Sequence, residues 1–312
     1  MRYTATGVLL LLTTCLLSQI TTKSEWDSKN KRYKIIAESD YHEYRVVKVT
    51  FDYIKGRCRD GNKGFVKTVG PGRKTLTTIS SIEGMSDSRP DFRYNSTSSS
   101  GRTDKKPDYG YPYLIPVQHG KKHKVDKQSY LGKTYGNYDP PKNWYSLSIK
   151  TNSGDTIYAA RQGVVYDVND NMESGSEKNI SYSQNINSLR IQHKDGTSAS
   201  YKPFQNGGIF VSNGDFVYAG DPIGVIGGEN YEYGSHLSFS VFHYDYYPKT
   251  KEGKETEEYF NYAYVPVDFH SVDGILSFEH CNTVIESVHE DNIICYEMSK
   301  KQRKKWNKRQ SK

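Results

Sequence analysis

The sequence predicts an all-β protein with two parts, a small N-terminal β-sandwich-like module and a larger antiparallel β-sandwich. Three observations lead to this fold class. Tyr is used 27 times, and aromatic and β-branched residues favour strands. Short runs of alternating apolar and polar residues recur, separated by turns rich in Gly, Asn and Asp. Amphipathic helical periodicity is weak along the whole chain.

The first 22 residues are expected to be an export signal that is removed. Arg2 precedes an apolar run from Gly7 to Leu17, which is short for a membrane span, and polar residues follow it. An uncleaved N-terminal anchor is the alternative. A lipidated Cys15 is less favoured, because Thr14 fits poorly before it and more apolar sequence follows. The protein is therefore predicted to be secreted or periplasmic.

Residues 23–93 are predicted to form the N-terminal β module, and residues 94–109 a linker. The strand-like runs are Tyr44–Tyr53, Gly64–Val69 and Thr75–Ile82. Turn signals at 59–62 and 70–72 separate these runs. Residues 94–108 are polar and rich in Ser, Lys and Asp, which is typical of an exposed linker.

Residues 110–280 are predicted to form the second domain, an antiparallel meander. Its strand-like runs are Asp155–Tyr166, Ser188–His193, Gly208–Val211, Asp215–Val217 and His236–Tyr244. Tight turns containing Gly with Asn or Asp lie between them. The insertion 169–187 is polar and is expected to be a loop.

The net charge of +7 belongs to one segment, the basic tail 299–312, which follows a C-terminal extension over 281–298. The tail carries eight of the 43 Lys and Arg residues and no acid, so 35 positive residues face 36 acids in the rest. Such tails are usually disordered and solvated. A tail that binds nucleic acid, anionic cell-wall polymer or lipid is one functional hypothesis.

Three cysteines follow the signal segment: Cys58, Cys281 and Cys295. No CxxC or Cys/His zinc-finger spacing is present. Export favours oxidation, and a Cys281–Cys295 disulfide would close a short loop. Two buried thiols, or a bridge from Cys58 to either partner, are the alternatives.

Four stretches in order resemble the lysostaphin/LytM/LasA-type zinc peptidoglycan endopeptidases, metallopeptidase family twenty-three, over roughly residues 110–275. They are Gly154–Val165, similar to a Gly-Thr-Pro-Ile-x-Ala strand pair; Leu189–Gly196 with Ala199–Tyr201, similar to a central hairpin; Gly214–Gly224, similar to a Gly-x-x-Val turn; and Gly234–Val241, similar to Gly-x-His-Leu-His-Phe-Glu-Val. The resemblance implies a lysostaphin-type β-sandwich. It also implies zinc held by a His and an Asp near the first strand and by the second His of His-x-His, which a strand aims into one groove.

At those positions this sequence departs from the family. Ser238 replaces the second His of His-x-His, Pro203 the hairpin His and Ser148 the Asp. The upstream His would fall at Trp144 or near 136–137, where no His occurs. Only His236 matches a family catalytic position. Hydroxyl groups and Pro are poor zinc ligands, so the resemblance implies a degenerate member with no metal and no cofactor.

An alternative metal site could be formed by residues near these positions: His119, His123, Asp126 and His243. Four Lys residues crowd the His119–Lys127 segment, and cations oppose metal binding, so a solvated loop is favoured. His243 lies seven residues after His236 and should face the other side of a regular strand. His236 itself is expected either to form part of the groove wall, bonded to a neighbour, or to contact a ligand.

The leading functional prediction is a non-catalytic, peptidase-like module that binds peptidoglycan, another glycan or an exported protein. Tyr201, Tyr231 and Tyr233 are expected to line its ligand groove, since aromatic rings contact sugars and peptides well; half-buried Tyr on β faces is the plainer interpretation. The alternatives are an active metalloendopeptidase with an unconventional zinc site, and the tail-mediated binder described above.

Overall fold

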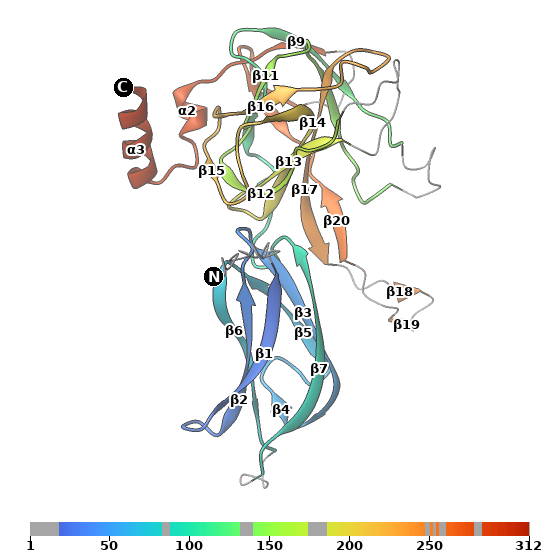
Figure 1. Ribbon diagram of the computed structural model, residues 1–312, viewed down its shortest axis with the longest axis vertical. Coiled ribbons are helices and arrows are strands. Elements are labelled where there is room, and N and C mark those ends of the chain that lie inside the picture. Colours follow the sequence, from blue (N-terminus) through green and yellow to red (C-terminus); the bar gives the residue numbers. More distant parts are fainter. Residues whose placement is uncertain are drawn as a thin grey trace, which may run out of the picture.

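The chain folds into two β domains stacked along its long axis (Figure 1). The structure, a computed structural model, describes residues 19–82, 88–131, 140–173, 186–246, 250–251, 254–255, 260–277 and 283–311. The mostly β fold agrees with the prediction. No helix in these ranges is long and apolar enough to cross a membrane.

The N-terminal domain is a sandwich of two antiparallel sheets. One sheet has the order β1 (Ile20–Asp27), β2 (Arg32–Ser39), β6 (Gly72–Ser80), β4 (Arg57–Cys58); the other has the order β5 (Gly64–Val69), β3 (Arg45–Lys55), β7 (Asp91–Ser100). Ile35 and Leu76 from the first sheet pack with Val47 and Val49 from the second. The apolar residues of each strand therefore face one core, and the polar ones face solvent.

Two predicted boundaries of this domain need correction. Residues 94–100 are not linker but the second half of β7, which pairs with β3 from Thr50↔Asn95 to Arg45↔Ser100. The Ser and Thr side chains here are exposed or half-buried. The backbone provides the strand's hydrogen bonds, so the polar composition alone suggested a loop. Residues 20–22 belong to β1, so removal of residues 1–22 would shorten that strand; residues 1–18 lie outside the described ranges.

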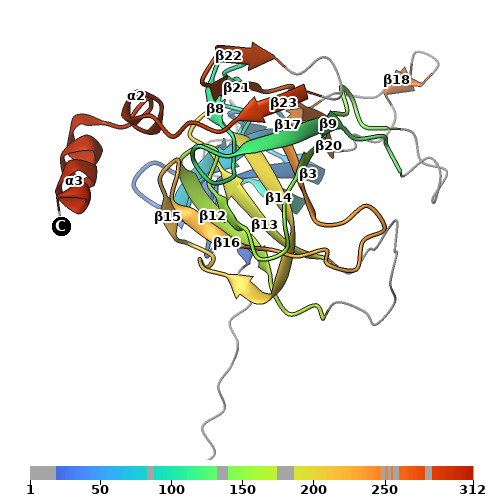
Figure 2. The same cartoon turned by 90° about the horizontal axis from the view of Figure 1, so that it is seen from above.

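The C-terminal domain is built on an eleven-stranded antiparallel sheet. Its main path runs β15 (Phe216–Val217), β12 (Gly163–Asn169), β13 (Asn187–Gln192), β14 (Thr197–Ile209), β17 (His236–Tyr246), β10 (Leu147–Lys150), β9 (Lys122–Lys127), β23 (Thr283–Glu286), with β11 (Thr156–Tyr158), β16 (Pro222–Ile226) and β20 (Phe260–Tyr264) beside it. A three-stranded sheet, β22 (Gly274–Ser277), β21 (Asp268–Ser271), β8 (Pro112–Leu114), lies on one side of the central strands (Figure 2). A separate pair, β18 (Thr250–Lys251) and β19 (Lys254–Glu255), completes the strands.

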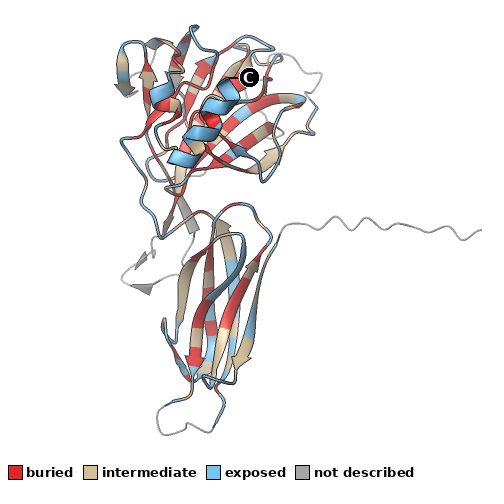
Figure 3. Cartoon of the chain, turned by 90° about the vertical axis from the view of Figure 1, so that its left-hand side faces the viewer, coloured by how far each residue is buried: buried red, intermediate tan, exposed pale blue. Residues whose placement is uncertain are grey.

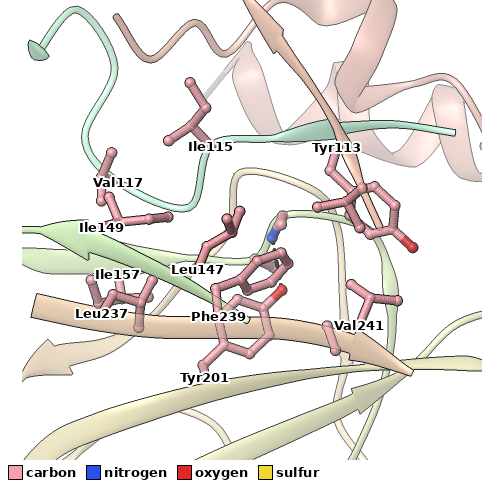
Figure 4. Close-up of a cluster of buried hydrophobic side chains, with 14 of the residues drawn as sticks. Tyr113, Ile115, Val117, Leu147, Ile149, Ile157, Tyr201, Leu237, Phe239 and Val241 are labelled. Carbon is pink, nitrogen blue, oxygen red and sulfur yellow. Dashed lines mark hydrogen bonds between the residues drawn. The ribbon is translucent and has the colours of Figure 1, made fainter. Parts of the chain in front are cut away.

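One face of the central sheet is buried in the domain core. Leu147 and Ile149 of β10 meet Leu237, Phe239 and Val241 of β17 there, with Tyr113, Ile115 and Val117 packed over them (Figure 4). Successive residues of a strand point to opposite faces. The intervening residues of β10 and β17, which are mostly Ser, therefore lie on the other face.

The end of the chain is helical, which corrects the expectation of a disordered basic tail. Two helices, α2 (Asp291–Ile294) and α3 (Lys300–Gln310), follow β23. Ser299 caps α3: its side chain accepts from Gln302 N, and the Gln302 side chain reaches back to Ser299 N. This capping box, together with burial of Trp306, stabilises a helix that a count of charges does not predict.

The domains contact each other through the residues around Tyr44 and the segment after β7. Gln192 of β13 accepts from Tyr44 N at 2.7 Å and donates to Tyr44 O at 2.9 Å. Arg102 stacks on the Tyr44 ring and pairs with Asp104, and Asp108 N donates to Asp195. The segment after residue 100 is thus fastened to the second domain at several points.

Candidate functional site

The positions that resemble metal-ligand positions lie side by side on two paired strands. Ser148 of β10 is directly opposite Ser238 of β17. Directly opposite residues on one face have Cβ atoms about 4.5–5.5 Å apart. Leu237 and Phe239, which flank Ser238, point into the core. The predicted juxtaposition of these two positions is therefore present, with hydroxyl side chains in it.

A Gln side chain holds this pair of strands together on the polar side. Gln128 Oε1 accepts from Ser238 Oγ at 2.7 Å and from Ser146 Oγ at 2.7 Å, and the two hydroxyls are 3.3 Å apart. Gln128 N also donates to Ser146 O, which extends the pairing of β9 with β10. The side-chain amide oxygen of Gln128 thus accepts two hydrogen bonds, and these bonds fix the positions of the Ser146 and Ser238 hydroxyls.

Charged residues flank the two Ser residues in the same row. Asp126 of β9 is opposite Ser148, and Lys202 of β14 is opposite Ser238. We call the residues Asp126, Gln128, Ser146, Ser148, Ser238 and Lys202 the polar face. Lys202 is exposed, yet desolvation by the surrounding protein, and then the nearby Arg190, lower its pKa. The row thus runs from the carboxylate of Asp126 to the ammonium of Lys202 across β9, β10, β17 and β14.

His236 closes one end of the polar face. It is opposite Lys150 on β10, its Nδ1 lies 3.0 Å from Gly234 O, and its ring is 5.4 Å from the ring of Tyr231. At that distance Nδ1–H donates to the carbonyl, which leaves Nε2 as the free ring nitrogen. Lys150 Nζ donates to Tyr233 O. His236 and Lys150 therefore both hold the 231–234 turn.

The predicted groove tyrosines occupy three different environments. Tyr233 is 74% exposed. Tyr231 is half-buried, and burial raises the pKa of its phenol. Tyr201 is fully buried in the core and its hydroxyl accepts from Ala160 N at 3.0 Å. The prediction that Tyr201 lines a ligand groove is therefore wrong, because alternation along β14 turns Tyr201 inward and Lys202 outward.

The remaining family position, Pro203, is buried beside Lys202 after a cis peptide bond. Trp144 contacts Tyr130 and Tyr264 edge-on or tilted, so it packs as an aromatic side chain. Residues 136–137, the other place for the upstream ligand, lie outside the described ranges.

The alternative cluster of His119, His123, Asp126 and His243 does not assemble. His123 faces away from Asp126 on β9, with Nδ1 2.7 Å from Lys150 O. His119 Nδ1 accepts from His289 N, and His243 Nδ1 lies 3.1 Å from Tyr244 O. Asp126 pairs with Lys124 at 3.2 Å. Within the described ranges, no three His, Cys, Asp or Glu side chains group as metal ligands would.

The cysteine prediction stays open. Cys58 is buried in the N-terminal domain, 3.4 Å from Thr77 Oγ1, and it is not bonded to Cys295, which is buried beside α2. Cys281 lies outside the described ranges. The pairing of Cys281 with Cys295 therefore remains a prediction, and a Cys58–Cys295 bridge is not formed.

Comparison with known proteins finds a family resemblance in part of the second domain. The family model for peptidase family M23 matches residues 142–251, which include β10, the hairpin β13–β14 and β17. This segment is therefore similar to peptidase family M23. The family resemblance that the four sequence stretches carry is confirmed for residues 142–251. No curated protein matches the sequence.

Solved structures similar to this chain include bacterial peptidases. A putative glycyl-glycine endopeptidase LytM from Ruminococcus gnavus is 15% identical, with TM-score 0.28, over 49% of this chain and 56% of that one. Lysostaphin from Staphylococcus simulans is 19% identical, with TM-score 0.25, over 43% and 47%. Helicobacter pylori Csd3 is 12% identical, with TM-score 0.29, over 95% and 80%. The chain spans about half the length of the first two proteins. Because all three TM-scores are low, the family resemblance rests on the matched segment 142–251.

Sequence reasoning found the Ser pair but missed Gln128, Ser146 and Lys202. Ser146 could have been found, because it lies two residues before Ser148 and so shares its face. Lys202 follows from the same rule once Tyr201 is placed in the core. Gln128 carried no signal, because it directly follows β9, a strand that is recognisable only from its pairing with β10.

Proposed function

We propose that the M23 domain of this protein has lost zinc endopeptidase activity and serves as a binding module. The ligand class we propose is peptidoglycan, a related glycan or an exported protein, outside the cytoplasm. The apolar run after Arg2, typical of an export signal, supports that location, as does the cell-wall chemistry that the resemblance implies.

One observation carries the proposal: the donor set on the polar face does not fit zinc. Zinc sites in proteins use thiolate, imidazole or carboxylate ligands, commonly three or four of them. Here the paired positions are Ser148 and Ser238, and Gln128 already accepts from Ser238. The nearest carboxylate, Asp126, pairs with Lys124. Neutral hydroxyls engaged in a hydrogen-bond cluster would leave the ion without charge compensation.

The same groups suit binding without cleavage. Hydroxyl and amide groups can exchange hydrogen bonds with a peptide or a sugar, and the ammonium of Lys202 can meet a carboxylate. Tyr233 and Tyr231, on the turn that His236 and Lys150 hold, offer aromatic surface beside that row. Peptidoglycan stem peptides and their acidic groups match this combination of contacts.

Metal analysis of the purified chain is the first test. We expect well under one equivalent of zinc after dialysis without chelator, and no release of peptides from purified peptidoglycan. About one equivalent of zinc, lost in His236→Ala, together with cleavage, would favour the alternative, an active metalloendopeptidase with an unconventional site.

A peptidoglycan pull-down tests the binding part. The double variant Tyr231→Ala/Tyr233→Ala and the single variant Lys202→Met should each retain less protein than the wild type. Tyr53→Ala, a substitution at a 42% exposed Tyr in the other domain, is the matched control and should bind normally. Equal retention of all four proteins would rule out the polar face as the binding surface.

A further inference from the structure

The basic helix α3 is fixed to the body of the protein in one orientation. Trp306 is its buried side chain, 8% exposed. Arg309 reaches Asp221 at 3.4 Å and lies over the Tyr218 ring, and Arg303 donates to Cys295 O at 3.2 Å. These anchors and the capping box at Ser299 determine which side of α3 faces outward.

The five lysines of α3 share the outward side. Successive residues turn by about 100° around a helix axis, because each turn has about 3.6 residues. Measured in this way, Lys304 and Lys308 lie nearly opposite Trp306, and the others flank them within a sector of about 140°. The two arginines lie on either side of Trp306. We call this set the lysine face: Lys300, Lys301, Lys304, Lys305, Lys308.

The lysine face is exposed and electrostatically unpaired. Figure 3 shows that most of α3 is exposed. All five lysine side chains are exposed, and none forms an ion pair or a side-chain hydrogen bond in the described part of the chain. The first turn of α3 has no acidic residue. Lysines spaced three or four residues apart on a helix repel each other. This arrangement lowers the stability of the helix itself and concentrates positive charge toward solvent.

The side chains of the lysine face favour one class of polyanion over others. Trp306 points inward, so the outward side has no apolar residue to enter a bilayer, as an interfacial membrane helix would need. It also has no aromatic ring or Arg fork to stack on or read bases. Lys supplies compact point charges that suit phosphate oxygens. Lys300, Lys304 and Lys308 are spaced by about 6 Å along the helix axis. A flexible chain of phosphates can therefore follow them.

We propose that the lysine face of α3 is a docking surface for a linear polyol-phosphate polymer of the cell envelope. This site is separate from the polar face and would tether the chain beside its ligand. The envelope location rests on the export that the proposed function includes, whereas the docking chemistry does not depend on the polar face.

The experiment measures binding of the full chain to poly(glycerol phosphate) by titration at several salt concentrations. The lysine face should neutralise about five phosphates. A plot of the logarithm of the association constant against the logarithm of the salt concentration should then have a slope of about −3.5. Raising salt from about 50 to about 200 mM should then weaken binding about 100-fold. The variant with all five lysines changed to Gln should lose binding by a similar factor at low salt.

The control replaces five exposed lysines elsewhere by Gln, which changes the net charge equally: Lys29, Lys31, Lys55, Lys63, Lys105. It should bind within about twofold of the wild type. Circular dichroism and thermal unfolding establish that both variants fold. Equal loss in both variants would overturn the proposal in favour of net charge alone. Tighter binding to single-stranded DNA or to anionic lipid vesicles at matched phosphate concentration would overturn the proposed occupant. Peptidoglycan free of polyol-phosphate tests the polar face separately.

Discussion

Replacing Glu297 by Gln should loosen the C-terminal segment from the second domain and lower the stability of the chain. Glu297 lies between α2 and α3. Arg161 Nε donates to Glu297 Oε2 at 2.9 Å and Arg161 Nη2 donates to Oε1, while Nη1 bonds Asp195 and the Tyr113 hydroxyl. The guanidinium is buried, and its ion pairs outweigh desolvation and raise the pKa of Arg161.

The magnitude follows from the burial of this pair. Breaking a buried ion pair by removing one partner costs about 3–5 kcal/mol, because the other charge stays buried. Asp195 remains beside Arg161 after the change, so we expect the lower end, about 3 kcal/mol. For a domain of this size each kcal/mol lowers Tm by about 2–4 °C, which gives a fall of about 6–12 °C. Trypsin should also cut within α3 sooner than in the wild type.

The assay is thermal unfolding with limited proteolysis, and Arg309→Gln is the matched control. That variant breaks an exposed 3.4 Å pair with Asp221, worth less than about 1 kcal/mol. A Tm for Glu297→Gln that differs from wild type no more than Arg309→Gln does, with unchanged cleavage of α3, would refute the reasoning.

Three further predictions concern pH, domain contact and oxidation. Burial lowers the pKa of His193 to about 3. The unfolded chain therefore binds a proton first, and this residue lowers the free energy of unfolding as pH drops below about 6.5, by up to about 1.4 kcal/mol per unit. Urea titrations should show a steeper slope in the wild type than in His193→Gln. Gln192→Leu removes both bonds to Tyr44 and should cost about 1–3 kcal/mol, with faster amide exchange at residues 41–45 by mass spectrometry. Peptide mapping without reduction should find Cys281 linked to Cys295, closing a loop worth roughly 3 kcal/mol; a peptide linked through Cys58 would contradict it.

The strands with apolar alternation were predictable from local sequence. The run Gly64–Val69 is β5 residue for residue, and Tyr44–Tyr53 and Thr75–Ile82 overlap β3 and β6 closely. These segments have their own periodicity, which matches the face they bury. The second half of β7 has none, because its side chains are mostly Ser and its strand character comes from pairing with β3. Such pairing is a long-range property that composition does not encode.

The site was predictable in its strand positions and only partly in its side chains. Motif order placed Ser148 and Ser238 correctly on facing strands. The orientation of Tyr201 was missed although the alternation Ser200-Tyr201-Lys202 contains it, because proximity in the motif was given more weight than strand parity. The basic tail was misjudged for a different reason: its one apolar residue, Trp306, finds a partner surface that only the folded domain creates.

The separation of the two sheet faces explains how the side chains of the polar face can vary while the core stays packed. The core face of β10 and β17 is made by Leu147, Ile149, Leu237 and Phe239, all buried. Residues on the opposite face touch the core through the backbone alone, so a His or Asp there can become Ser with little loss of buried apolar area. Gln128 then joins the two strands through hydroxyls, and each such bond contributes about 0.5–1.5 kcal/mol. The choice of polar side chains on one face therefore affects the packing of the other face little.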